Sequence, residues 1–222
     1  MPKPGKRAAI EDLQAVMARL RGPNGCPWDR EQTHQTLRFH AVEEVYELLD
    51  AIEAEDDHEI TEELGDLLLQ VIFHCQLGKE RGAFHFEKVA RHITDKLIRR
   101  HPHVFGDAKV KDVDEVWANW EKIKHAEKKG TKHERPSVFD GIPRHLPALL
   151  RAQKLFRKAR KAKFVAAAKR SKLSRARLAA ELFRLAQAAQ QRGWSAEELL
   201  RAESARRERN WRKAEAAGSR RS

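Results

Sequence analysis

Two short stretches of this sequence, AVEEVYELLD and EELGDLLLQ, carry closely spaced carboxylates beside apolar residues. The carboxylates are Glu43, Glu44 and Glu47 in the first stretch and Glu63 and Asp66 in the second. On a helix, residues three apart lie toward one side, about one turn from each other. Each stretch therefore presents a carboxylate pair on one side of a helix, Glu44 with Glu47 and Glu63 with Asp66.

The positions of these pairs predict that they meet. Apolar residues at helical spacing predict one helix over residues 33–54 and another over 59–81. If the two helices are antiparallel neighbours, residues that face each other have a constant sum of residue numbers. Two pairs share the sum 110, whose midpoint falls in the acidic turn at residues 55–57: Glu47 with Glu63, and Glu44 with Asp66. We therefore expect four carboxylates at one level between two helices.

Four negative charges at this distance repel each other, and the loss of surrounding water adds to the cost. A hard divalent cation removes the repulsion, and an all-oxygen site without histidine favours Mg²⁺, or Mn²⁺, over zinc. Mg²⁺ often takes a substrate phosphate as a further ligand. The simpler alternative is a solvated helix face, but matched spacing on two helices favours the metal site. A di-iron bundle would need Glu-x-x-His on core-facing turns, whereas Glu31/His34 and Glu55/His58 show this spacing only in polar turn regions.

The composition favours an all-α protein. Of the 222 residues, 41% are hydrophobic and 35% charged, and runs of β-branched residues are scarce. The remaining helices are predicted over residues 10–21, 86–100, 114–128, 147–162, 173–191 and 196–217, with a linker at 130–147. No apolar run reaches the roughly 18–20 residues of a membrane span, and the N-terminal MPKPGKRAAIEDL lacks the apolar region of a secretory signal. Cys26 and Cys75 form no disulfide framework, so we expect reduced thiols and a cytoplasmic protein.

Further motifs accompany the carboxylates, and together they resemble the MazG family of nucleoside triphosphate pyrophosphohydrolases. The motifs are CPWD at 26–29, EEVYE at 43–47, ELGD at 63–66, KLIRRHPHVF at 96–105, WEKIK at 120–124 and IPRHLPALLRAQK at 142–154. They cover roughly residues 10–155, in the family's order and spacing. The resemblance implies a MazG-like helical bundle that forms a homodimer. It also implies Mg²⁺-dependent cleavage of a nucleoside triphosphate into a monophosphate and diphosphate. Such an enzyme has a house-cleaning role, the removal of unwanted nucleotides from the pool.

The resemblance assigns roles to individual residues. The residues that match the family's metal ligands are Glu44, Glu47, Glu63 and Asp66. Lys96 and Arg100 match its phosphate-contacting residues, and Trp120 matches an aromatic near the bound nucleotide. Lys96 and Arg100 lie one turn apart, which suits gripping a polyphosphate, although the macrodipole also favours cations at a helix C-terminus.

Three roles stay open on the residues alone. Trp28 and Trp120 suit stacking on a nucleobase, and each suits burial in a core at least as well. Glu43 and Glu47 are both candidates for the catalytic general base, and the sequence does not choose between them.

The charge divides the chain into two regions. Residues 1–150 contain 23 Lys and Arg against 27 Asp and Glu, a balance of −4, whereas residues 151–222 contain 22 against 6, a balance of +16. We therefore predict a catalytic helical domain at 1–145 and a basic helical tail at 146–222. The tail resembles a degenerate second MazG-like domain. Arg177 and Ala180 stand where ExxD is expected, no EExxE precedes them in 164–178, and Asn210 replaces the Arg of the basic pair.

The tail has two interpretations. It is either a structural remnant that packs as amphipathic helices or an arm that binds nucleic acid through its charge. The interleaving of Arg with Ala and Leu favours the remnant. For the whole chain, the corresponding alternative to an enzyme is a non-catalytic helical protein with a nucleic-acid-binding tail. The expected partners are nucleoside triphosphates and a second copy of the chain. Nucleic acid is a further partner if the tail is a binding arm, and no membrane partner is expected.

Overall fold

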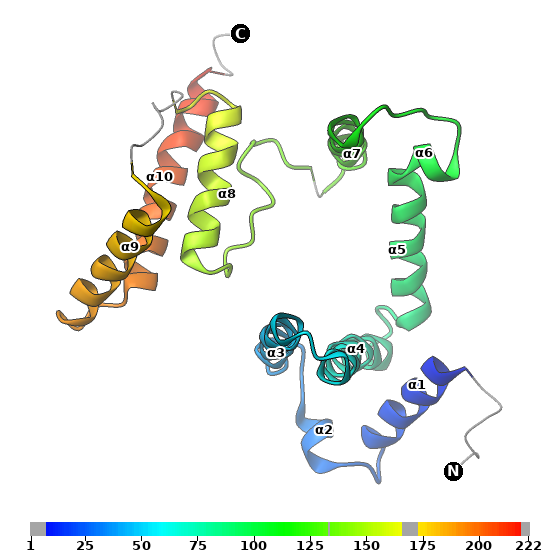
Figure 1. Cartoon of the computed structure of the whole chain (residues 1–222). Coiled ribbons are helices and arrows are strands. Elements are labelled where there is room, and N and C mark those ends of the chain that lie inside the picture. Colours follow the sequence, from blue (N-terminus) through cyan, green and yellow to red (C-terminus); the bar gives the residue numbers. More distant parts are fainter. Residues whose placement is uncertain (1–7, 133, 166–172, 219–222) are drawn as a thin grey trace. The chain divides into compact units, whose positions relative to one another are not determined.

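The computed structural model describes residues 8–132, 134–165 and 173–218. These residues form helices α1 to α10 and contain no strand, which confirms the predicted all-α class (Figure 1). The chain divides into two compact units, residues 1–120 and 121–222, and each unit is described by itself. Parts of two segments used in the sequence analysis, residues 1–7 and 166–172, lie outside the described residues.

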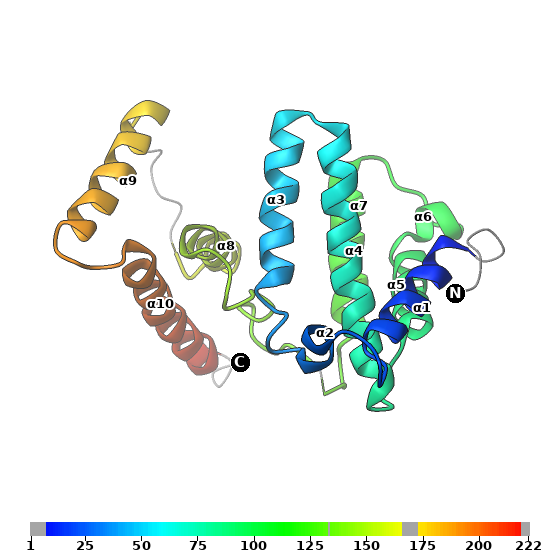
Figure 2. The same cartoon turned by 90° about the horizontal axis from the view of Figure 1, so that it is seen from below.

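A long antiparallel hairpin of α3 (His40–Ala54) and α4 (Asp57–Glu80) forms the centre of the first unit. The two helices lie side by side in both views (Figures 1 and 2). Glu55 ends α3 in the left-handed conformation, with φ 56°. The Asp56 carboxylate then caps α4 by accepting from the backbone N–H groups of His58 and Glu59 at 2.9 and 3.3 Å. The predicted turn at residues 55–57 is therefore confirmed.

The core of the first unit lies under the second half of α4. Helix α1 (Ala9–Leu20) packs on α4, and the buried residues that meet there are Met17, Leu37, Ile72, Phe73 and Leu77. Helix α2 (Pro27–Glu31) follows, with a proline at its first position. No helix was predicted in this stretch, because so short a helix has no periodicity to detect.

The helix predicted from residue 33 begins only at His40. Residues 34–39 form turns instead. The Thr36 hydroxyl accepts from the backbone N–H of Thr33 at 2.9 Å and donates to the Gln32 side chain at 2.8 Å. Such local side-chain hydrogen bonds compete with helix formation, and they explain why the apolar pattern extended the prediction too far.

Helices α5 (Phe86–Arg100), α6 (Pro102–Phe105) and α7 (Val113–Ala126) complete the first unit, and α7 continues across the division between the units. Gly82, with φ 65°, turns the chain out of α4. In Figure 1, where α3 and α4 are seen end-on, α5 runs crosswise to the hairpin and its C-terminal half leads away from it. The short helix α6 was not predicted.

The second unit consists of α8 (Ala148–Lys161), α9 (Arg175–Gln190) and α10 (Ala196–Gly218). These helices agree with the predicted ranges. α8 packs on α10 around a core of Phe139, Leu155 and Ala159, and the Phe139 ring stacks on Trp211 with ring centres 5.6 Å apart. No helix in the described part of the chain combines the length and the hydropathy that a membrane crossing requires.

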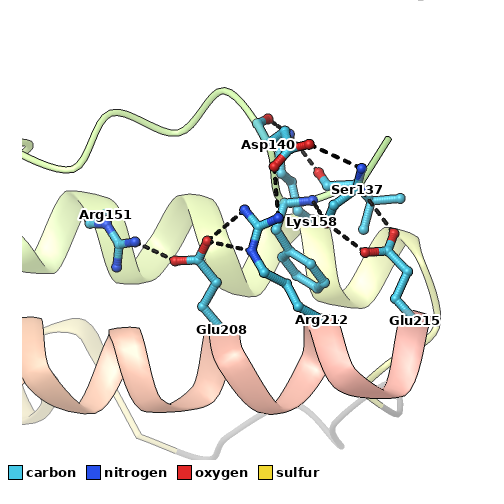
Figure 3. A network of polar contacts seen from close by, with 9 residues as sticks. Ser137, Asp140, Arg151, Lys158, Glu208, Arg212 and Glu215 are labelled. Atoms are coloured by element: carbon cyan, nitrogen blue, oxygen red, sulfur yellow. Dashed lines mark hydrogen bonds and ion pairs between the residues drawn. The ribbon is translucent and has the colours of Figure 1, made fainter. Parts of the chain in front are cut away.

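The stretch that the sequence predicted as a linker is tied to α8 and α10 by a polar network (Figure 3). Lys158 Nζ donates to the carbonyl groups of Val138 and Asp140 at 2.7 and 2.8 Å. Arg212 pairs with Asp140 at 2.7 Å and with Glu208 at 2.8 Å, and Glu208 also binds the buried Arg151. These contacts make residues 137–140 part of the second unit, which therefore begins before the boundary predicted at 145.

Candidate functional site

The hairpin brings three of the predicted metal ligands together. One carboxylate oxygen from each of Glu44, Glu63 and Asp66 lies within 4.8 Å of the other two, and all three side chains are half-buried. Glu44 comes from α3, while Glu63 and Asp66 lie one turn apart on α4. The proximity expected from the common residue-number sum is therefore confirmed for these three, while their role as metal ligands stays a prediction.

Glu47 belongs to the same group electrostatically. Loss of hydration raises the pKa of its carboxyl group, and further increases come from the charges of Glu44 and Glu43, a hydrogen bond with Glu44, and the charge of Asp66. Loss of hydration likewise raises the pKa of Glu63, with Glu47, Asp66 and Glu44 as the main charges that add to it. In the protein without metal, both glutamates are therefore harder to ionise than usual.

One buried oxygen of this cluster receives no hydrogen bond within the described part of the chain to replace its lost hydration. Glu63 Oε2 is buried and accepts no hydrogen bond from any described residue. A buried carboxylate oxygen normally recovers its lost hydration from a donor or a cation. Because the surrounding groups are carboxylates that repel it, a divalent cation fits this position, and the all-oxygen donor set suits Mg²⁺ or Mn²⁺. The acidic cluster is thus able to hold a metal ion.

Gln70 is a site residue that the sequence analysis missed. It lies one turn after Asp66 on α4, is 7% exposed, and donates from Nε2 to Glu44 Oε1 at 3.2 Å. The signal was available in the sequence, because Gln70 follows Asp66 by four residues and Glu63 by seven, which places all three on one side of the helix.

Glu43 and Trp28 lie outside the group of Glu44, Glu63 and Asp66. Glu43 is exposed, and one of its oxygens lies 3.7 Å from His40 Nδ1. Trp28, on α2, makes edge-to-face contacts with His40 and Phe73 at ring-centre distances of 6.1 and 6.5 Å. It remains 53% exposed, so one side of the ring packs on the protein and another is open to solvent.

Two of the predicted phosphate and nucleotide residues, Arg100 and Trp120, contact each other. The Arg100 guanidinium lies 5.0 Å from the ring centre of Trp120, and Trp117 meets Trp120 edge-on at 5.8 Å. Lys96 is half-buried one turn before Arg100 on α5. The half of α5 that carries Lys96 and Arg100 leads away from the α3–α4 hairpin in Figure 1.

A cavity of about 410 Å³ lies elsewhere in the first unit, and its lining includes Arg21, Arg30, His34, Glu80 and Arg81. Several of its polar groups already have partners, although His34 Nε2 is buried without one among the described residues. Arg21 pairs with Glu80 at 2.8 Å, and His34 Nδ1 lies 2.8 Å from His74 Nδ1. None of the predicted site residues lines this cavity.

Comparison with known proteins identifies the part of the chain that carries the cluster. A family model, the MazG nucleotide pyrophosphohydrolase domain, matches residues 32–105. Residues 32–105 of this chain are therefore a MazG domain. The matched range contains the carboxylate hairpin and α5, and therefore Lys96 and Arg100. Trp28, Trp120 and the second unit lie outside it.

Curated relatives support the MazG assignment over a longer range. The chain is 51% identical over 143 residues to the uncharacterized protein YabN of Bacillus subtilis (strain 168), covering 64% of this chain and 29% of YabN. It is 50% identical over 147 residues to the nucleoside triphosphate pyrophosphohydrolase of Escherichia coli (strain K12), covering 66% and 55%. It is 46% identical over 152 residues to the nucleoside triphosphate pyrophosphohydrolase/pyrophosphatase MazG of Thermotoga maritima, covering 68% and 57%. The chain thus spans less than a third of YabN and little more than half of the other two relatives.

Proposed function

We propose that this chain hydrolyses a nucleoside triphosphate to a nucleoside monophosphate and diphosphate, with Mg²⁺ as its cation. The observation that carries the proposal is the approach of Glu44, Glu63 and Asp66 to within 4.8 Å of one another, inside the range that matches the pyrophosphohydrolase domain. The names of the Escherichia coli and Thermotoga maritima relatives support the substrate class.

The residues that would hold the cation are Glu44, Glu47, Glu63 and Asp66. When bound, a divalent cation neutralises phosphate oxygens and makes a bound water more acidic. The buried and unpartnered Glu63 Oε2 supports this assignment, as does the raised pKa of Glu47 and Glu63, which results from lost hydration and from neighbouring carboxylates.

Glu47 and Glu43 are the two candidates for accepting the proton of the attacking water. The raised pKa of Glu47 brings it closer to the range in which a carboxylate is an effective base. Glu43 instead lies beside His40, on the exposed side of α3. We therefore favour Glu47. Comparison of Glu47→Gln with Glu43→Gln at saturating metal separates the two, since loss of the base lowers kcat much more than loss of a neighbouring charge.

We assign Lys96 and Arg100 to the phosphates and Trp120, with Trp28, to the nucleobase. Since the half of α5 that carries Lys96 and Arg100 leads away from the hairpin, the assignment goes together with a homodimer. Exposed apolar residues on the hairpin and on α5 support a dimer, because such a surface rarely remains open to water. They include Val45, Leu49, Ile52, Leu64, Leu68, Ile93 and Leu97. Light scattering of the wild type and Leu68→Glu tests it, with a dimer expected for the first and dissociation for the second.

Incubation with each ribonucleoside and deoxyribonucleoside triphosphate tests the activity. With Mg²⁺, we expect monophosphate and diphosphate in equal amounts by phosphorus NMR, and no turnover after chelation. Nucleoside diphosphate and phosphate would identify a different hydrolase. A protein that binds Mg²⁺ and turns over no nucleotide would contradict the proposal. The role in cleaning the nucleotide pool and the location in the cytoplasm stay predictions of the sequence.

The second candidate function is nucleic-acid binding by the basic second unit, which a balance of +16 over residues 151–222 favours. Against it, several arginines of α10 are held by carboxylates of the same unit, as in the pairs Arg201–Glu197, Arg206–Glu203 and Arg212–Asp140. Fluorescence anisotropy with labelled DNA and RNA distinguishes the two functions. A steep loss of affinity with salt supports an arm, and absence of binding at low salt supports a packed remnant.

A further inference from the structure

Gln70 is buried beside the carboxylate cluster and is fixed by it. Its Nε2 donates to Glu44 Oε1 at 3.2 Å. A carboxylate only accepts hydrogen bonds, so this contact determines which end of the Gln70 amide faces Glu44. One such bond leaves the other acceptor positions of Glu44 available to a cation.

The other end of the amide shows that Gln70 is not explained by packing. Gln70 Oε1 is buried and has no hydrogen-bond partner among the described residues, although the side chain is only 7% exposed. A buried acceptor without a partner lowers the stability of the folded state. An apolar side chain of the same length would fill the space without this cost, so the amide has a use other than stabilising the core.

The residue also occupies a particular place on α4. Glu63, Asp66 and Gln70 follow one another along one side of the helix, and Glu44 reaches this side from α3. Without a donor, the Glu44 carboxylate would face only the repelling charges of its neighbours and would rotate toward water. The Gln70 amide is a neutral donor that counteracts this rotation and leaves the charge of Glu44 unchanged.

We propose that Gln70 is a positioning residue of the metal site, which holds the Glu44 carboxylate across from Glu63 and Asp66 in the orientation that binds the divalent cation. This inference rests on the metal site of the proposed function. Groups that orient metal ligands by hydrogen bonds commonly change metal affinity by about 10- to 100-fold when they are removed. Gln70 acts through Glu44, so it should affect the affinity for metal far more than the rate at saturating metal.

The experiment compares Gln70→Met with Gln76→Met, using Mn²⁺ as the probe. Gln76 is a matched control, because it lies on the same helix and also donates from Nε2 to a carboxylate, Glu80 Oε1 at 2.9 Å, away from the cluster. Mn²⁺ affinity is measured by calorimetry and by electron paramagnetic resonance. We expect Gln70→Met to weaken it by about 10- to 100-fold and Gln76→Met to leave it unchanged.

Two further measurements separate positioning from a structural defect. Thermal unfolding in chelator should show Gln70→Met at least as stable as the wild type, since the unpartnered oxygen is removed. If Gln70→Met does not fold, Gln70→Leu replaces it. The metal concentration for half-maximal rate should rise in parallel with the loss of affinity, while kcat at saturating Mg²⁺ stays near that of the wild type.

The possible failures are distinguishable. If the wild type binds Mn²⁺ and Gln70→Met binds it as tightly, the role of Gln70 is wrong and the metal site stands. If Gln70→Met and Gln76→Met weaken binding equally, the effect is general to α4 and the positioning role is also wrong. If the wild type does not bind Mn²⁺, the metal site of the proposed function fails, and this inference fails with it.

Discussion

Replacing Glu63 by glutamine should change the stability of this protein in opposite directions with and without metal. Glu63 contributes a carboxylate to the cluster with Glu44 and Asp66, and one of its oxygens is buried without a partner. Without metal, the negative charge of Glu63 destabilises the folded state. With metal, the same charge is a ligand. Glu63→Gln keeps the size of the side chain and removes only the charge.

The sign without metal follows from the pKa. The folded state raises the pKa of Glu63 above its usual 4.5 through lost hydration and neighbouring carboxylates, so folding favours the protonated form. The resulting stabilisation is complete below the unfolded pKa and is lost as the pH rises through the higher folded pKa. At neutral pH this stabilisation is absent, and the repulsion between Glu63 and the neighbouring carboxylates destabilises the folded state. The glutamine variant, which is always neutral, should therefore unfold at a higher temperature than the wild type in chelator.

The magnitude with metal follows from linkage. A cation that binds only the folded state, at a concentration about 100 times its Kd, stabilises that state by about 2.7 kcal/mol. For a chain of this size, each kcal/mol corresponds to roughly 2–4 °C in Tm, so the wild type should gain about 5–10 °C from Mg²⁺. Glu63→Gln loses a charged ligand, and we expect most of this gain to disappear.

Thermal unfolding followed by circular dichroism, in chelator and across an Mg²⁺ titration at neutral pH, measures both effects. Glu53→Gln is the matched control, because Glu53 is an exposed carboxylate on α3 outside the cluster. It should change neither the stability in chelator nor the gain from Mg²⁺. The reasoning is refuted if Glu63→Gln is less stable than the wild type in chelator, or if it keeps the full gain from the cation.

Three more predictions concern Glu47, Lys96 and Glu208. Because the pKa of Glu47 is raised, protons should compete with the cation, so that affinity falls as the pH drops through the raised pKa; calorimetry in buffers of different ionisation enthalpy would detect the released protons. Lys96→Met should lower kcat/KM for the triphosphate by about 10- to 100-fold, through loss of a charge-assisted contact of roughly 1.5–3 kcal/mol, without changing the circular dichroism spectrum. Glu208→Ala leaves the buried Arg151 without its partner and should destabilise the second unit by about 3 kcal/mol. The control Glu203→Ala removes only exposed ion pairs, so it should lower the free energy of unfolding by less than about 1 kcal/mol.

The hairpin and its carboxylates could be predicted from the sequence because both depend on local spacing. Helical periodicity fixes which side of each helix a residue occupies, and a short turn fixes which residues face each other. The turn itself was visible in Glu55, Asp56 and Asp57, of which Glu55 takes the left-handed position and Asp56 caps the next helix. Local rules were sufficient because no long-range contact competes with them here.

The remaining errors arise where tertiary contacts decide. The direction of α5 relative to the hairpin is not encoded in its own periodicity, so it was not foreseen that the half with Lys96 and Arg100 leads away from the hairpin. The segment predicted as a linker is held by Phe139 in the core and by Asp140 in the polar network, and neither contact leaves a pattern in a stretch rich in glycine and proline. Gln70 was overlooked because a glutamine within an apolar run shows its importance only once its partner is known.

The distribution of burial along α4 gives the metal site its physical context. The buried residues of α4 all lie between Gln70 and Gly78, where α1 and the turns before α3 cover the helix. The half that carries Glu63 and Asp66 packs on α3, and its neighbours Leu64 and Leu68 are 50% and 39% exposed. Because its apolar side chains are more exposed than those of the other half, we expect this half to be the less stable one in a single chain. A cation that cancels the repulsion there would stabilise the helix where its own packing contributes least, so metal binding and the local order of the hairpin should be coupled.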